Sequence, residues 1–360
     1  MIEIDGNYGE GGGAILRYAL ALSTLTQKPF HMVNIRQGRS KPGLKPQHLF
    51  CINGLVDLCG AKIDHPDIGD KEVKFKPEII SKNALQIDIG TAGSISLLMQ
   101  SFILPILFSK KKVAMKIIGG TDVPYSQPMD YFINVFIPSL EKYGDFNMWL
   151  ERRGFYPKGG GILRIDIEGK YDFKSDLNIP AIQRTDRKKL RWIRGKSVAT
   201  MKLIQSQVAE RMRLSAKKEL NGLTPHISIE AQYTPALSDG AITTLWVGYD
   251  NGNGEILPAN NHKIMLGADC LGKKEISAED VGKSAALNLK TEMDSGASTD
   301  LHLADQIIPY MGVVTSMTGN QCQIITSKIT DHLRSNIYVT EKFLDVKFLI
   351  SQNQVTCQKS

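Results

Sequence analysis

Cysteine is scarce in this chain and never stands in a metal-binding or redox spacing. Five cysteines occur among 360 residues, and no two of them form a CxxC pair. An odd, scattered set argues against both a disulfide framework and a zinc site. We therefore expect reduced, structural cysteines at five positions: Cys51, Cys59, Cys270, Cys322 and Cys357.

Long apolar runs are also missing. The longest run, residues 95–108, is interrupted by Ser96, Gln100 and Ser101, and it falls short of the ~20 residues that span a bilayer. The first residues lack the basic and apolar regions of a secretory signal. We expect no membrane segment and a cytoplasmic location.

The composition argues against a disordered or fibrous chain. Hydrophobic residues make up 42% and charged residues 22% of the chain, which is typical of a folded protein with a substantial core. A formal net charge of +7 attracts polyanions such as nucleic acid. Many basic proteins bind no nucleic acid, so the charge alone does not identify a partner.

The sequence contains an internal repeat of about 84 residues. Gly6 and Gly90 stand 84 residues apart, and each follows an alternating apolar run and precedes a helical pattern. Pro46 and Pro128, at the starts of the second helices, stand 82 residues apart. Self-similarity of this kind predicts repeated βαβα-type units that share one core.

A third, more divergent copy occupies the C-terminal part. Its expected elements are a helix from Leu301, a strand over residues 323–326 and a second helix over residues 336–344. Residues 182–294 do not fit the repeat and open with a cluster of arginine and lysine. We predict an α/β fold with a large domain, residues 1–181 and 295–360, and an inserted small α/β domain, residues 182–294.

Glu10 lies in a glycine-rich loop between the first strand and the first helix. Glycine occupies positions 9, 11, 12 and 13, so backbone amides can approach an anion there. The loop does not match the GxxxxGK[ST] phosphate-binding pattern. Two interpretations stay open: a tight turn with an acidic residue near a helix N-terminus, or a carboxylate that holds a divalent cation.

Three further residues lie in equivalent loops of the repeat. Arg36 and Arg39 bracket Gly38 after the second strand, where they form either a fork for phosphate or ordinary solvated surface. His332 follows the corresponding strand of the third copy, in a predicted loop. If the loops converge, Glu10, Arg36, Arg39 and His332 share one cleft.

Five sequence blocks together resemble the RNA 3′-terminal phosphate cyclase family. They run through almost the whole chain in the family's order: Glu10-Gly-Gly-Gly13, Ile35-Arg-Gln-Gly-Arg-Ser-Lys-Pro-Gly-Leu44, Gly119-Gly-Thr-Asp122, Gly154-Phe-Tyr-Pro-Lys-Gly-Gly-Gly161 and His302-Leu-Ala-Asp-Gln306. In this family, three βαβαββ-like units form the large domain, and a smaller α/β domain is inserted in the third. The resemblance thus agrees with the repeat and its interruption.

The resemblance implies an enzyme of the ligase class that forms phosphoric ester bonds. Such an enzyme converts an RNA 3′-phosphate to a 2′,3′-cyclic phosphate while ATP is split to AMP and pyrophosphate. The implied intermediates are a histidyl-AMP and an RNA-(3′)pp(5′)A. The implied substrates are ATP and RNA with a 3′-terminal phosphate, and the implied cofactor is a divalent metal, either magnesium or manganese. The resemblance implies no membrane partner.

The resemblance also assigns roles by position. His332 would be the nucleophile and Glu10 the metal ligand. The phosphate-binding residues would be Arg17, Arg36, Arg39 and Gln47, and the nucleotide-binding residues Gln100, His302, Leu303, Ala304, Asp305 and Gln306. His302 replaces the aromatic residue that some members place beneath adenine, and we assign it to stacking.

Two other positions depart from the family pattern. The prolyl contact on the opposite face of adenine falls near Gln127 or Pro128, and the insert's aromatic contact has no clear counterpart in residues 266–274. Two other functions remain alternatives: a non-catalytic cyclase-like ribosome-assembly factor, and an enolpyruvyl transferase built from related repeats. Retention of His332 and Glu10 favours the enzyme over the assembly factor.

Overall fold

Three of the four β-sheets formed by the residues that the structure describes repeat a single topology. The computed structural model describes residues 1–249 and 265–360. In each of these three sheets, the first strand in chain order is parallel to the second, and the fourth lies between the second and the third. This arrangement is the βαβαββ unit that the family resemblance implied. The α/β class predicted from the sequence is confirmed.

The first unit follows the predicted pattern of strands and helices. Its elements are β1 (Ile2–Asp5), α1 (Gly13–Thr26), β2 (Phe30–Val33), α2 (Pro46–Cys59), β3 (Lys62–Ile63) and β4 (Val73–Lys76), with the sheet order β1-β2-β4-β3. Pro46 begins α2 because its missing N–H would have no partner in the first turn. Gly60 ends α2 with a φ of 71°, a conformation that favours glycine.

The second unit is less regular. Its elements are β5 (Ala84–Asp88), α3 (Ile95–Met99), α4 (Ile103–Leu107), β6 (Lys112–Gly119), α5 (Met129–Tyr131), η1 (Phe132–Phe136), η2 (Ile137–Ser139), β7 (Gly144–Arg152) and β8 (Gly161–Gly169), with the order β5-β6-β8-β7. The longest apolar run of the sequence forms α3 and α4, and most of its apolar side chains lie in the main core.

The third unit is interrupted after its first strand. Its elements are β9 (Gln183–Arg184), α8 (Leu301–Thr318), β14 (Cys322–Ile325), α9 (Asp331–Phe343), β15 (Val346–Ser351) and β16 (Gln354–Lys359), with the order β15-β16-β14-β9. The prediction that His332 lies in a loop is wrong. Thr330 caps α9 by accepting a hydrogen bond from the Leu333 amide, so His332 belongs to the first helical turn.

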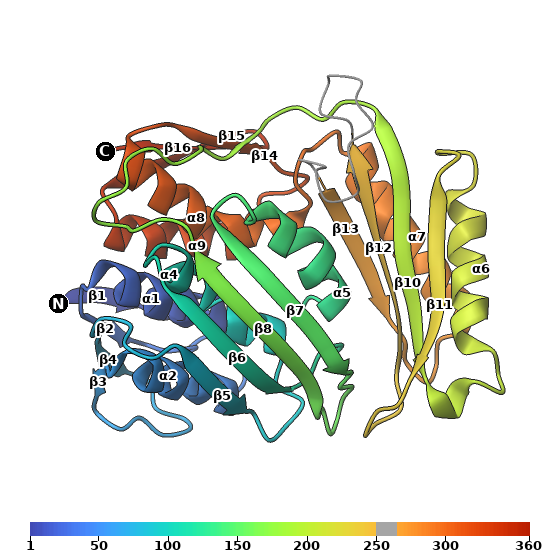
Figure 1. Cartoon of the computed structure of the whole chain (residues 1–360), viewed down its shortest axis with the longest axis horizontal. Helices are drawn as coiled ribbons and strands as arrows, with labels where there is room; N and C mark the ends of the chain where they lie inside the picture. Colours follow the sequence, from blue (N-terminus) through green and yellow to red (C-terminus); the bar gives the residue numbers. More distant parts are fainter. Residues whose placement is uncertain (250–264) are drawn as a thin grey trace.

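The insert lies between β9 and α8, and Figure 1 shows it beside the three repeats. Its elements are β10 (Leu190–Thr200), η3 (Met201–Leu203), α6 (Val208–Leu220), β11 (Ile227–Thr234), β12 (Ala241–Tyr249), β13 (Met265–Leu271) and α7 (Ala278–Asp294), with the order β11-β10-β12-β13. A separate apolar cluster joins its sheet to α6 and α7. The boundaries of the insert at residues 182 and 294 stay a prediction. Strand β9 lies within these boundaries, but it pairs with β14 of the third unit.

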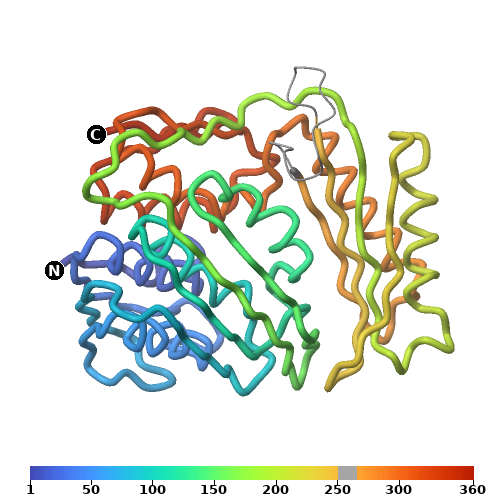
Figure 2. Tube along the Cα trace, viewed as in Figure 1, coloured from blue at the N-terminus to red at the C-terminus, as the bar shows by residue number. Residues whose placement is uncertain are grey.

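Both chain ends lie on the body formed by the repeats, away from the insert (Figure 2). All five cysteines are free, as expected, and four of them are buried. Among residues 1–249 and 265–360, no helix combines the length and apolar character required to cross a membrane.

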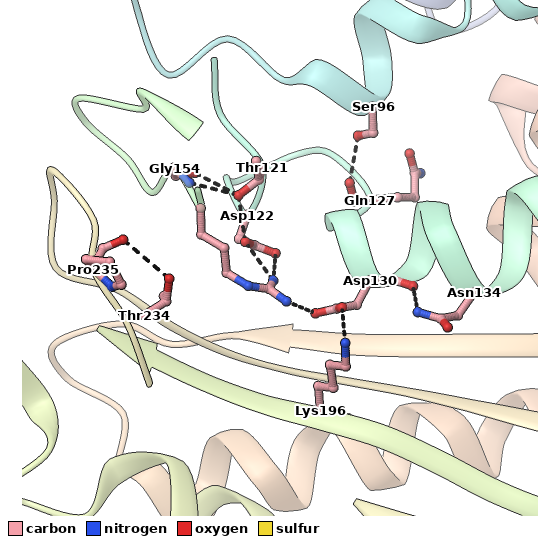
Figure 3. Close-up of polar contacts among 11 residues, drawn as sticks. Ser96, Thr121, Asp122, Gln127, Asp130, Asn134, Gly154, Lys196, Thr234 and Pro235 are labelled. Atoms are coloured by element: carbon pink, nitrogen blue, oxygen red, sulfur yellow. Dashed lines mark hydrogen bonds and ion pairs between the residues drawn. The ribbon is translucent and has the colours of Figure 1, made fainter. Parts of the chain in front are cut away.

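A buried ionic network joins the second unit to the insert (Figure 3). The Arg153 guanidinium contacts Asp122 at 3.1 Å and Asp130 at 2.6 Å, and all three side chains are at most 5% exposed. From β10, Lys196 Nζ lies 3.6 Å from the Asp130 carboxylate. Asp122 follows β6, in the loop equivalent to that of Arg36 and Arg39, so this loop serves the interface with the insert.

Candidate functional site

The glycine-rich loop after β1 is shaped by close contact with α9. Gly9 and Gly11 both have a φ of 59°, a left-handed conformation that side chains other than glycine rarely adopt. A Cβ on Gly9 would lie 2.6 Å from Ser335 Oγ. The loop therefore rests on α9 only because glycine occupies this position, and that contact brings Glu10 beside His332.

Glu10 joins two of the predicted site residues. One carboxylate oxygen is paired with Nη2 of Arg39. The other, Oε2, lies 2.5 Å from Nε2 of His332, although it is buried and makes no directed hydrogen bond within the described residues. Two neighbouring loops of the first unit and the distant start of α9 thus meet at one carboxylate, as predicted for Glu10, Arg39 and His332.

The predicted phosphate-binding arginines form a site with excess positive charge. Arg17 is buried, and its Nε donates a 2.8 Å hydrogen bond to Oε1 of Gln100. Burial lowers the pKa of Arg17 and also that of Arg36. Nε of Arg36 and Nε of Arg39 are buried without a hydrogen-bond partner among the described residues. Such unpaired donors are costly unless a ligand accepts from them.

Gln47, the fourth predicted phosphate-binding residue, makes its hydrogen bond outside the group of Glu10, Arg39 and His332. Its Nε2 donates to the Ser94 carbonyl at 3.3 Å, so it connects α2 to the start of α3. In the structure, neither Glu10 nor His332 contacts it through a hydrogen bond or ion pair. Its predicted role in phosphate binding stays a prediction.

His332 lies in an environment that keeps its imidazole neutral at neutral pH. Its pKa is lowered, first by burial and then by the charges of Arg17 and Arg39, while Asp305 acts in the opposite direction. Asp305 itself is 8% exposed, and burial raises its pKa to about 7. The Thr330 hydroxyl donates to this carboxyl group, which connects α8 to the cap of α9.

The predicted nucleotide segment forms the first turns of α8. Nδ1 of His302 lies 3.3 Å from Nε2 of Gln127, one of the two positions predicted for the opposite wall. Nε2 of Gln306 donates to the His302 carbonyl at 3.0 Å. Leu303 and Ala304 are 0% exposed in the main core, so they support the helix, and their contact with a nucleotide stays a prediction.

Similarity to known proteins agrees with this geometry. The family model described as RNA 3′-terminal phosphate cyclase matches residues 8–350. The chain belongs to this family. It is 38% identical over 349 residues to the RNA 3′-terminal phosphate cyclase of Pyrococcus abyssi, covering 97% of this chain and 94% of the relative. It is also 38% identical over 359 residues to that of Methanosarcina barkeri, covering 98% of each chain.

The side chains around Glu10 suit a metal ion that is held partly by substrate phosphates. Within residues 1–249 and 265–360, no group of three or more histidine, cysteine, aspartate or glutamate side chains is placed to enclose an ion. Glu10 offers one carboxylate beside the arginines. Mg²⁺ is commonly held by one or two carboxylates, substrate phosphates and water. This cyclase-family site therefore fits a metal that arrives with a triphosphate.

Two residues of the site were missed by the sequence reasoning. The Tyr131 ring stands edge-on to His302, with centroids 6.1 Å apart, and no sequence signal marks it. Asp300 caps α8, accepting hydrogen bonds from the amides of His302 and Leu303 at 2.9 Å. Aspartate just before a helical pattern is an N-cap signal, so Asp300 was within reach of sequence analysis.

Proposed function

We propose that this chain uses ATP to convert an RNA 3′-phosphate to a 2′,3′-cyclic phosphate, with His332 as the covalent residue. The observation that carries the proposal is the contact of Glu10 with both Arg39 and His332. This contact gathers a nucleophile, a metal ligand and a phosphate ligand at one point. The curated relatives bear the name of this activity.

The first step is attack by the neutral imidazole of His332 on the α-phosphorus of ATP. A P–N bond forms, the bond to the β-phosphate oxygen breaks, and pyrophosphate leaves. The lowered pKa of His332 favours this step, because only the unprotonated nitrogen has a lone pair to donate. Arg17, Arg36 and Arg39 hold the phosphates in line with the imidazole.

Two further transfers complete the reaction. A 3′-phosphate oxygen of the RNA attacks the α-phosphorus, the P–N bond breaks, and RNA-(3′)pp(5′)A forms. The adjacent 2′-oxygen then attacks the 3′-phosphorus, loses its proton, and expels AMP. In this scheme Glu10 would hold a divalent metal, magnesium or manganese, whose charge offsets the negative charge that develops on the leaving group.

The adenine side of the site is built from α8. Burial lowers the pKa of His302, so its ring is neutral and suited to stack against adenine. Asp305 and Gln306 supply polar groups from the same turns of α8, and Gln100, which accepts a hydrogen bond from Arg17, is the third polar residue that we assign to the nucleotide. The five free cysteines fit a reducing compartment, and the cytoplasm is the location that this proposal assigns.

The experiment that tests the function uses ATP labelled at the α-phosphate. The protein should acquire label that acid removes and base does not, and peptide mapping should place it on His332. His332→Ala should abolish both labelling and cyclisation, whereas His226→Ala, an exposed histidine outside the site, should change neither. RNA that is already adenylylated should still be cyclised by His332→Ala.

Two results would reject this function. Label on His302 or on a lysine would refute the assignment of the nucleophile. Absence of any covalent AMP on the wild-type protein would favour the non-catalytic assembly factor.

A further inference from the structure

An exposed tyrosine, Tyr8, stacks on a partly buried one, Tyr338, beside the loop that carries Glu10. Tyr8 belongs to the loop that carries Glu10, and it is 43% exposed. Its ring stacks on that of Tyr338 in α9, with centroids 4.0 Å apart and planes inclined by 12°. The Tyr338 hydroxyl accepts a 3.0 Å hydrogen bond from the Asp5 amide. One face of Tyr8 is thus supported by a fixed ring, and the side chain keeps a large surface open to solvent.

The proposed chemistry places RNA on this side of the site. In the proposed scheme the incoming 3′-phosphate attacks the α-phosphorus opposite His332, where pyrophosphate departs, and Arg36 and Arg39 would hold its oxygens. The loop of Tyr8 is tied to that arginine loop, because Oδ1 of Asn7 accepts a 2.7 Å hydrogen bond from the Gly38 amide. An RNA strand held by the arginines would therefore lie beside the loop of Tyr8, whereas adenine would lie near His302.

Positive charge follows the same face of α9. Lys342 Nζ lies 5.4 Å from the centroid of the Tyr338 ring. Arg334, four residues before Tyr338, is exposed, and residues four apart share one face of a helix. The neighbouring Asp5 carboxylate accepts hydrogen bonds from Asn7 and Asn34. Tyr8 and Tyr338, with Arg334 and Lys342 beside them, form an aromatic platform flanked by cations. Proteins bind single-stranded nucleic acid on surfaces of this kind.

We propose that Tyr8, supported by Tyr338, stacks one of the last two bases of the RNA substrate. This inference rests on the proposed function and names how its site recognises RNA. Every base has a π-face, so stacking holds the strand without selecting its sequence. Tyr8 would thereby position the 3′-phosphate among the arginines while leaving the identity of the terminal base open.

The first test compares Tyr8→Ala, Tyr8→Phe and the control Trp149→Ala, which removes a 52% exposed ring from β7. Base–aromatic stacking is worth about 1–3 kcal/mol, or roughly a 5- to 150-fold change in affinity. Tyr8→Ala should raise KM for RNA 3′-phosphate by that factor and leave adenylylation by ATP alone within about twofold. Tyr8→Phe and Trp149→Ala should behave like the wild type. An unchanged KM in Tyr8→Ala would overturn the proposal.

The second test changes the RNA and needs no stable variant. An abasic nucleotide is placed either at the last or at the penultimate position of the RNA. At one of these two positions it should weaken binding to the wild-type protein by roughly 5- to 150-fold, the factor expected for Tyr8→Ala. With Tyr8→Ala, the same abasic RNA should lose nothing further, because the two changes remove one interaction. If the wild-type protein binds both abasic RNAs as tightly as the intact strand, the proposal that Tyr8 stacks a base is refuted. Failure of the wild type to form covalent AMP would instead refute the proposed function.

Discussion

Removal of the Glu10 carboxylate separates its role in catalysis from its role in the fold. Glu10 pairs with Arg39 and His332, and the exposed fractions of the three side chains are 26%, 36% and 48%. The partly exposed ion pair with Arg39 contributes about 0–1 kcal/mol, and the contact with the neutral imidazole of His332 contributes at most about 1 kcal/mol more. Glu10→Ala should therefore lower the free energy of unfolding by at most about 2 kcal/mol, and Glu10→Gln, which keeps the shape, by less.

The expected loss of catalysis is larger. A metal held by Glu10 would stabilise the charge on departing pyrophosphate, a contribution of several kcal/mol in metal-dependent enzymes. A loss of about 3 kcal/mol corresponds to a rate that is roughly 100-fold lower. Both Glu10→Ala and Glu10→Gln should show this loss in the adenylylation step, since an amide is a poor ligand for a hard cation.

The assay is single-turnover transfer of labelled AMP to the protein at increasing magnesium or manganese. Unfolding by urea, measured in parallel, gives the stability of each variant. Glu3→Gln serves as the matched control, because Glu3 is a 66% exposed carboxylate in β1 that pairs with His31. Adenylylation at the wild-type rate in both Glu10 variants would remove Glu10 from the mechanism.

Three further results are expected. Because burial lowers the pKa of His332 from its usual 6.5, the rate of adenylylation should be constant above neutrality and fall only below pH 6.5. The Asp305 charge raises the pKa of His332, so Asp305→Asn should move that fall to lower pH. A shift to higher pH would contradict the assignment of His332. RNA 3′-phosphates differing only in the terminal base should be cyclised with similar kcat/KM, and a 3′-hydroxyl strand should bind without reacting; strong base discrimination would count against phosphate-directed recognition. Arg153→Met leaves buried Asp122 without a cation and buried Asp130 with Lys196 alone, and it should cost about 3–5 kcal/mol in urea unfolding; Arg164→Met, which removes a 51% exposed side chain from its pair with Glu151, should cost under ~1 kcal/mol.

Local signals explain why much of the fold was predictable. Proline at the start of α2 and glycine at its end act through backbone geometry alone, so their recurrence revealed the repeat. The start of α9 was misplaced because the pattern was followed only from Asn336. The Thr330 cap moves the helix start to Asp331. Strand β9 has only two residues and exists through its pairing with β14, which no local pattern reveals.

The candidate site was predictable where it depends on the repeat. Glu10 and Arg39 follow the parallel strands β1 and β2 of one sheet, whereas His332 follows β14 of another. Their convergence was expected because corresponding loops of repeated units that share one core can meet. The second unit breaks that rule. Asp122 occupies the equivalent loop but is buried against Arg153. Pairing with a side chain 31 residues away depends on tertiary packing, which spacing does not encode.

The place of the insert connects the repeat to the nucleotide segment. In the first two units, a short glycine-rich loop joins the first strand to the first helix, and in unit one that loop carries Glu10. In the third unit the whole insert replaces it. The chain returns beside its point of departure, because the Ser298 hydroxyl donates to the carbonyl of Arg184, the last residue of β9.

Asp300 shows the consequence of this connection. One of its carboxylate oxygens accepts from the Tyr131 hydroxyl at 2.6 Å and from the amides that begin α8. The other accepts from the Gly267 amide of β13 at 2.9 Å. One buried side chain therefore holds the second unit, the insert and the start of the nucleotide segment together. Because His302 and Asp305 extend from that same helix start, the hydrogen bonds of Asp300 connect their position to that of β13 and Tyr131.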